Sequence, residues 1–160
     1  MTDPSARHQK RAFAICRVHA EVVDDAGRGT AWISINVTDR EEGWIDNHRC
    51  PDGAVILTGN TGRWVGGNQA AFLGGPDLVL EVLSEDDDTY LKLPFYRDRG
   101  VREVLIVDQD GGRAELWRLS GDEYSRVPEP LRSEVTGLVY VQGSEALEIR
   151  DSATGRTWRM

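Results

Sequence analysis

A glutamate stands in the middle of an apolar segment, where a charge is unexpected. The segment LVLEVL, from Leu78 to Leu83, otherwise contains only leucine and valine, and Glu81 is its fourth residue. A carboxylate inside a sheet core costs several kcal/mol unless a metal ion or a cation meets it. Because side chains alternate along a strand, Asp77 shares a face with Glu81 and supplies a second carboxylate. The pattern favours a metal site, and the alternative is that Glu81 pairs with an arginine for structural reasons.

Another acidic residue, Asp52, precedes a second apolar segment. It follows Cys50 and Pro51 and leads into GAVIL, residues 53 to 57. If this strand lies beside LVLEVL, the two backbones are about 4.8 Å apart, and Asp52 and Glu81 can share one divalent ion. A pair of carboxylates suits Mg²⁺, or the similar ion Mn²⁺. The alternative is that Asp52 is an ordinary turn residue after proline.

Lys92 lies on the helix predicted to follow, four residues before Tyr96 and on the same helical face. A lysine beside a bound metal can hold or deprotonate an attacking water and stabilise the charge that develops on a phosphate. The alternative is a solvated surface lysine. His8 and His19 are about 16 Å apart along a helix axis, so helix-end or packing roles are expected for them rather than a shared metal.

A sheet and helices are needed to position these residues, and the sequence predicts both. Residues 8 to 23 carry apolar side chains at a three-and-four spacing, which is typical of an amphipathic helix. A second helix is expected to start in the acidic run 85 to 88 and to stop at Gly100. The glycine-rich segment 58 to 68 is expected to be a loop. Strands are expected at the β-branched or near-continuous apolar segments 30–37, 53–57, 78–83, 103–108, 113–119, 138–141, 147–149 and 157–159. This order predicts a mixed α/β (α+β) fold, with one mixed central sheet flanked by helices.

Composition limits the size of the fold and its partners. A chain of 160 residues that is 39% hydrophobic is expected to form a single domain, residues 1–160. Its net charge of -8 argues against a surface that binds nucleic acid all over, so a DNA contact would need a local basic patch or metal ions. No apolar run approaches the roughly 20 residues of a membrane span, and no signal peptide is recognisable, so a cytoplasmic protein with no membrane partner is expected. In a reducing cytosol Cys16 and Cys50 are expected to be buried thiols.

An ordered set of motifs runs from Cys50 to Leu119. The chain has CPD at residues 50–52, PDLVLEVLS at residues 76–84, Asp88 four residues before Lys92, then Tyr96, Gly100-Val101 and VLIVD at residues 104–108. In this order the motifs resemble the signature of the Uma-two family of putative restriction endonucleases, within the PD-(D/E)XK nuclease superfamily. Leucine stands at residue 83, where the superfamily's motif has its lysine, and the family is similar in drawing its lysine from the next helix.

The resemblance implies a restriction endonuclease-like core and a Mg²⁺-dependent DNA endonuclease. It makes Asp52 and Glu81 metal ligands and Lys92 the catalytic lysine, with Asp77, Tyr96 and His8 ranked below them. It also implies that the chain begins near the family's second helix, without the usual N-terminal helix and hairpin. One alternative is a non-catalytic module that keeps the fold and binds nucleic acid or protein. Another is an assembly protein whose strands after residue 104 form a homodimer.

Overall fold

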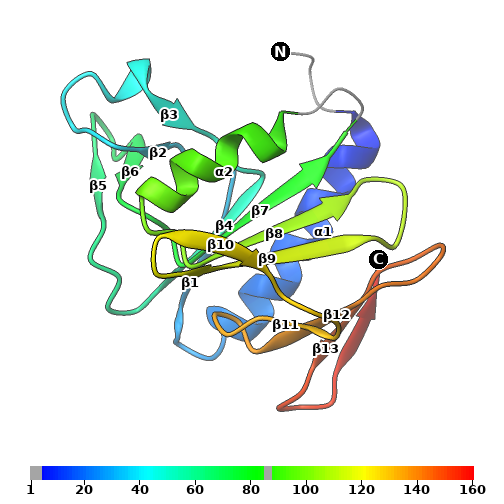
Figure 1. Ribbon diagram of the computed structural model, residues 1–160. Helices are drawn as coiled ribbons and strands as arrows, with labels where there is room; N and C mark the ends of the chain where they lie inside the picture. Colours follow the sequence, from blue (N-terminus) through cyan, green and yellow to red (C-terminus); the bar gives the residue numbers. More distant parts are fainter. Residues whose placement is uncertain (1–4, 85–87) are drawn as a thin grey trace.

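A computed structural model of the protein describes residues 5–84 and 88–160, and its centre is a six-stranded mixed sheet (Figure 1). Neighbouring strands run antiparallel except β7 and β8, which are parallel and are joined by a helix, as a parallel crossover requires. The strands, in their order across the sheet, are β1 (Gly29–Ile33), β4 (Gly53–Leu57), β7 (Leu78–Leu83), β8 (Glu103–Asp108), β9 (Ala114–Ser120) and β10 (Glu123–Arg126).

Two helices cover opposite faces of this sheet: α1 (Ala6–Val23) and α2 (Thr89–Asp98) (Figure 1). Alternation along β7 divides its side chains between the two faces. Leu80 and its even-numbered neighbours pack in the core that contains α1, whereas Val79 packs with Tyr96 of α2. Glu81 is therefore directed to the α2 face.

Two smaller sheets complete the fold, each with four strands. The C-terminal sheet shares its apolar core with α1 and the central sheet. Its strands are β11 (Leu131–Arg132), β12 (Leu138–Val141), β13 (Glu148–Asp151) and β14 (Thr157–Arg159). The other sheet consists of β3 (His48–Arg49), β2 (Val37–Thr38), β6 (Ala71–Leu73) and β5 (Arg63–Val65), with a short 3-10 helix at Trp44–Asp46 before β3.

The predicted fold class and most of the predicted elements are confirmed, including both helices and the strands at residues 53–57, 78–83 and 103–108. The predicted single strand 30–37 is wrong, because the chain leaves the central sheet at Ser34, which adopts a positive φ of 51°. The strands of residues 5–84 and 88–160 form three sheets instead of one, and β5 lies inside the segment predicted to be a loop. Residues 85–87 of the acidic run lie outside the described residues.

Two further expectations concern burial. Cys16 is buried as expected, but Cys50 is exposed, because it precedes β4 at the end of the sheet rather than inside it. Across residues 5–84 and 88–160, no helix is long and apolar enough to cross a membrane.

Candidate active site

Strand pairing brings Asp52 and Glu81 to adjacent positions. β4 and β7 are antiparallel neighbours in which Gly53 pairs with Leu80, so Asp52 and Glu81 occupy the next position along the two chains. The Asp52 side chain extends the ladder, since its Oδ2 accepts a hydrogen bond of 2.7 Å from the backbone N–H of Val82. The Asp52 carboxylate therefore adds one side-chain hydrogen bond to the backbone pairing of β4 with β7.

Glu81 is almost completely buried, with 2% of its surface exposed. Two side chains of α2 meet its carboxylate: the Lys92 ammonium donates to Oε2 at 2.8 Å, and the Tyr96 hydroxyl donates to Oε1 at 2.5 Å. Burial raises the pKa of Glu81 to about 7, against the opposing effects of Lys92 and Tyr96, and the nearby Asp52 carboxylate raises it further. Near neutral pH this carboxyl group is thus poised between its neutral and charged forms.

A second buried glutamate, on the neighbouring strand β8, shows what a purely structural carboxylate looks like in this fold. Glu103 is 1% exposed, and Arg118 donates to its Oε1 through two guanidinium nitrogens at 3.0 and 2.9 Å. The Ser133 hydroxyl and the backbone N–H of Glu134 donate to it as well. Glu81 has no arginine partner among the described residues and meets Lys92 and Tyr96 instead, so the pairing of a buried glutamate with an arginine occurs at Glu103.

Lys92 projects from the first turns of α2 toward the end of β7. Its ammonium lies between Glu81 and Asp88, the latter at 3.7 Å from Nζ to Oδ1. The side chain is 18% exposed, whereas that of Asp88 is 70% exposed. The alternative of a solvated surface lysine therefore does not describe Lys92.

His8 holds Asp52 from the other side of the sheet. It lies in the first turn of α1, where Ser5 Oγ accepts its backbone N–H, and its Nε2 is 2.8 Å from Asp52 Oδ1. Because a carboxylate only accepts, Nε2 carries the proton, and the buried Nδ1 has no partner in the described part of the chain. The close approach of α1 to β4 depends on Gly53, where a Cβ would collide with the Cys16 sulfur.

Cys50 is a member of this group that the sequence did not single out for chemistry. The residue is exposed overall, yet partial burial of its thiol, followed by the carboxylates of Asp52 and Glu81, raises its pKa. The thiol therefore stays protonated at neutral pH. Its position two residues before Asp52 was the only signal that could have indicated its place.

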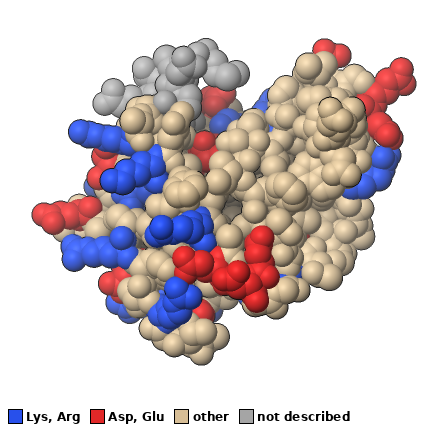
Figure 2. Space-filling model, turned by 180° about the vertical axis from the view of Figure 1, so that it is seen from behind, with Lys and Arg blue, Asp and Glu red and all other residues tan. Residues whose placement is uncertain are grey.

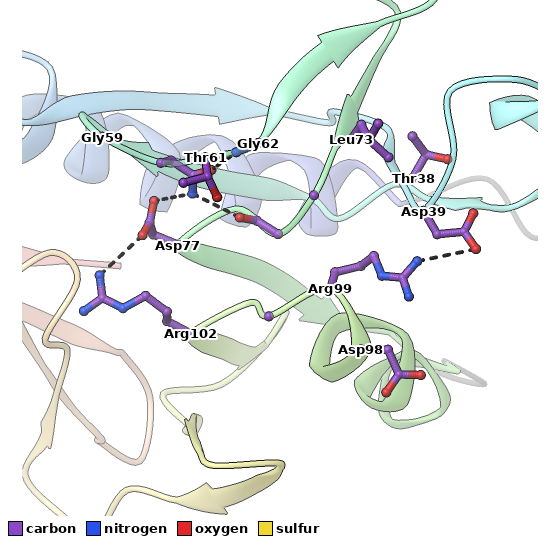
Figure 3. A pocket seen from close by; sticks show the side chains of 14 residues that line it. Thr38, Asp39, Gly59, Thr61, Gly62, Leu73, Asp77, Asp98, Arg99 and Arg102 are labelled. Carbon is purple, nitrogen blue, oxygen red and sulfur yellow. Dashed lines mark hydrogen bonds and ion pairs between the residues drawn. The ribbon is translucent and has the colours of Figure 1, made fainter.

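Asp77 lies away from this group, directly before β7 and four residues before Glu81. It borders a separate pocket of about 670 Å³, where Arg102 lies 3.3 Å from its Oδ1 (Figure 3). Its Oδ2 accepts hydrogen bonds of 2.8 Å from Asn60 Nδ2 and from the backbone N–H of Leu57. These bonds tie Asp77 to the loop after β4, at the opposite end of β7 from Glu81.

The comparisons with known proteins concern the family and the fold of the chain. Residues 1–148 match the model of the Uma2 family, which is described as "putative restriction endonuclease". The chain belongs to the Uma2 family. A similar solved structure is that of a putative nuclease belonging to DUF820 from Anabaena variabilis, with 20% sequence identity, a TM-score of 0.61, and coverage of 83% of this chain and 75% of that one. No curated protein matches the chain. The likeness in structure confirms the predicted mixed α/β core of this Uma2 member.

The oxygens of Asp52 and Glu81 decide whether the site can accept a divalent cation. All four carboxylate oxygens of Asp52 and Glu81 already accept hydrogen bonds, from His8 and a backbone N–H on one side and from Lys92 and Tyr96 on the other. Within the described residues, no three His, Cys, Asp or Glu side chains gather in a way that could hold a metal. Mg²⁺ needs only one or two carboxylates because it retains several waters, and each carboxylate oxygen has a second lone pair. A cation held by this pair would draw its remaining ligands from water and substrate oxygens.

Proposed function

We propose that this Uma2-family chain is a divalent-metal-dependent DNA endonuclease that hydrolyses phosphodiester bonds. The observation that carries the proposal is the Lys92 ammonium, which reaches 2.8 Å from the Glu81 carboxylate at the place where Asp52 lies on the neighbouring strand. An acid pair and a lysine at one end of a sheet are the groups that metal-assisted hydrolysis of a phosphodiester needs. Membership of a family described as restriction endonucleases supports the same reading.

Each residue has a task in this proposal. Asp52 and Glu81 would hold Mg²⁺ or Mn²⁺, which when bound polarises a phosphoryl oxygen as a Lewis acid. Lys92 orients the attacking water and stabilises the charge that develops on the phosphate. Tyr96 keeps Glu81 in one orientation through its hydroxyl, and His8 does the same for Asp52 through Nε2.

The raised pKa of Glu81 gives the lysine an additional task. Burial makes the Glu81 carboxylate easy to protonate near neutral pH, and a proton on Glu81 competes with a metal ion for the same oxygens. Lys92 lowers the pKa of Glu81 through its positive charge and its hydrogen bond. Lys92 thereby keeps a larger share of Glu81 charged and available to the cation.

The proposal is tested by incubating the purified protein with plasmid and linear duplex DNA, with Mg²⁺, with Mn²⁺ and with EDTA. Cleavage should require the metal, and Asp52→Asn, Glu81→Gln and Lys92→Ala should each reduce the rate about 100-fold or more. Glu103→Gln is the matched control, since it alters a buried strand glutamate with a structural partner, and its folded fraction should cleave normally.

A wild-type protein that binds DNA but never cuts it, with any metal, would contradict the proposal. That outcome would favour the non-catalytic binding module.

A further inference from the structure

A basic groove lies along the exposed side of α1. It has a volume of about 620 Å³ and is bordered by α1, by the connection between β8 and β9, and by the C-terminal residues of β14. Five of its lining residues are basic, and Asp110 is the one acidic lining residue among the described positions. The basic lining residues are Arg7, Lys10, Arg11, Arg17 and Arg159. In a chain with a net charge of -8, this concentration of positive charge is a local exception.

The helical spacing gathers these charges into a row. Arg7, Lys10 and Arg17 are all exposed, and intervals of three and seven residues place them on one face of α1. The first acidic residue of α1 is Glu21, so the half of the helix nearest the candidate active site carries no negative side chain. Figure 2 shows Lys and Arg side chains gathered on one side of the rear face, below the grey atoms, with a group of acidic side chains farther down.

The charges are available to a ligand. Arg7 pairs with Asp110 at 3.1 Å, but the two side chains are 80% and 50% exposed, and such a pair contributes little to stability. Arg17 lies 3.9 Å from Glu21, which is at the limit of an ion pair. Arg11 is instead buried and donates to the carbonyl oxygen of Gly111 at 2.5 Å, so it fixes the β8–β9 connection that forms the wall of the groove.

The row of basic residues begins at the end of α1 that also carries His8. Arg7, at one end of the row, directly precedes His8, whose ring contacts Asp52. From Arg7 to Arg17 the row extends about 15 Å along the helix axis. One strand of duplex DNA has a phosphate every 3.4 Å or so along its axis, so this length corresponds to about four phosphates.

We propose that this groove binds the phosphate backbone of one DNA strand and holds the substrate beside the site formed by Asp52, Glu81 and Lys92. The inference rests on the proposed nuclease function and deepens it by assigning the surface that positions the substrate. An acidic protein segment would also be attracted by positive charge. DNA is the better occupant, because the row starts at the end of α1 where His8 contacts Asp52, and its basic groups lie along a line that several consecutive phosphates can follow.

The test compares two double variants that each remove two positive charges. Lys10→Gln/Arg17→Gln alters the groove, and Arg63→Gln/Arg126→Gln alters other surfaces. The control variant is matched to the groove variant in exposure and surroundings. The side chains of Arg17, Arg63 and Arg126 are 60%, 57% and 58% exposed, and each lies near a glutamate. Binding of a short fluorescein-labelled duplex is measured by anisotropy in Ca²⁺ and in EDTA, from about 50 to about 200 mM salt. Cleavage is measured separately with Mg²⁺ and Mn²⁺.

The groove variant should bind the duplex about tenfold more weakly or worse at low salt, and its slope of log K against log salt should be smaller by about two. The control variant should keep the wild-type slope. Equal slopes of log K against log salt for the two variants would overturn the proposal. It would also be overturned if the wild type bound no duplex in either Ca²⁺ or EDTA, or if it bound polyglutamate more tightly than DNA. If the groove variant binds and cleaves DNA as the wild type does, the proposed role of the groove is refuted and the nuclease function is not. If DNA binding depends on the groove but the wild type never cleaves, the nuclease function is refuted and the role of the groove is not.

Discussion

Replacing Glu81 by glutamine should change how the stability of the metal-free protein depends on pH. Burial raises the pKa of Glu81 from its ordinary value of 4.5 to about 7, so the folded chain binds this proton more tightly than the unfolded chain. The contribution of this group to stability is fully present below about pH 4.5 and is lost as the pH rises through about 7. The difference corresponds to about 3 kcal/mol, because each pH unit counts about 1.4 kcal/mol.

The Glu81→Gln variant keeps the shape of the side chain and removes its titration. Its amide oxygen can accept from Lys92 Nζ, and its amide nitrogen can donate to the Tyr96 oxygen, so both contacts survive in altered form. Urea denaturation in EDTA should therefore show similar stabilities near pH 4.5 and a variant that is more stable by about 3 kcal/mol above pH 8. The difference between the two proteins should rise smoothly between these limits.

Metal addition provides the second half of this test. At pH 8, Mn²⁺ should raise the melting temperature of the wild type by relieving the repulsion between Asp52 and Glu81, and it should stabilise Glu81→Gln much less. A stability difference that stays flat from pH 4.5 to 8 would refute the argument that burial dominates the pKa of Glu81. Equal stabilisation of both proteins by Mn²⁺ would refute the shared metal site.

Substitutions at three positions test the partners of the two carboxylates. Lys92→Ala should reduce metal-dependent cleavage about 100-fold or more while circular dichroism remains unchanged. Lys92→Arg should restore little, because the larger planar guanidinium cannot take the position of the compact ammonium beside Glu81. Wild-type cleavage by Lys92→Ala would contradict its role. Tyr96→Phe removes a hydrogen bond that lowers the pKa of Glu81. The inflection in the plot of unfolding free energy against pH should therefore move to higher pH. An inflection at the same pH would show that this bond contributes nothing to the pKa. His8→Gln should lower the apparent metal affinity or the activity about 10- to 100-fold, because Asp52 loses the contact that orients it. The cleavage rate is measured as a function of metal concentration, and an unchanged curve would restrict His8 to a packing role.

Much of the fold could be predicted because its information is local. The apolar stretches of β7 and β8 and the three-and-four spacing of α1 identify their elements from neighbouring residues alone. Glu81 was recognisable for the same reason, since a charge inside an apolar strand is conspicuous without knowledge of its partners. The break at Ser34 was not predictable, because its positive φ accompanies a long-range hydrogen bond from its N–H to the carbonyl oxygen of Asp52.

The sequence by itself determined the family, the two helices and most strands of the central sheet, and it singled out the acidic pair and the lysine as candidates, because these depend on residue types and short spacings. Only the tertiary structure decided that Asp77 serves a separate pocket while Glu81 meets Lys92, although Asp77 stands only four residues before Glu81. It alone joined His8 to Asp52 across 44 positions of sequence. It also placed residues of α1 beside the C-terminal strand to form the basic groove. Contacts of this kind arise from the packing of elements on the central sheet, and packing depends on all the surfaces that meet, which no local pattern contains.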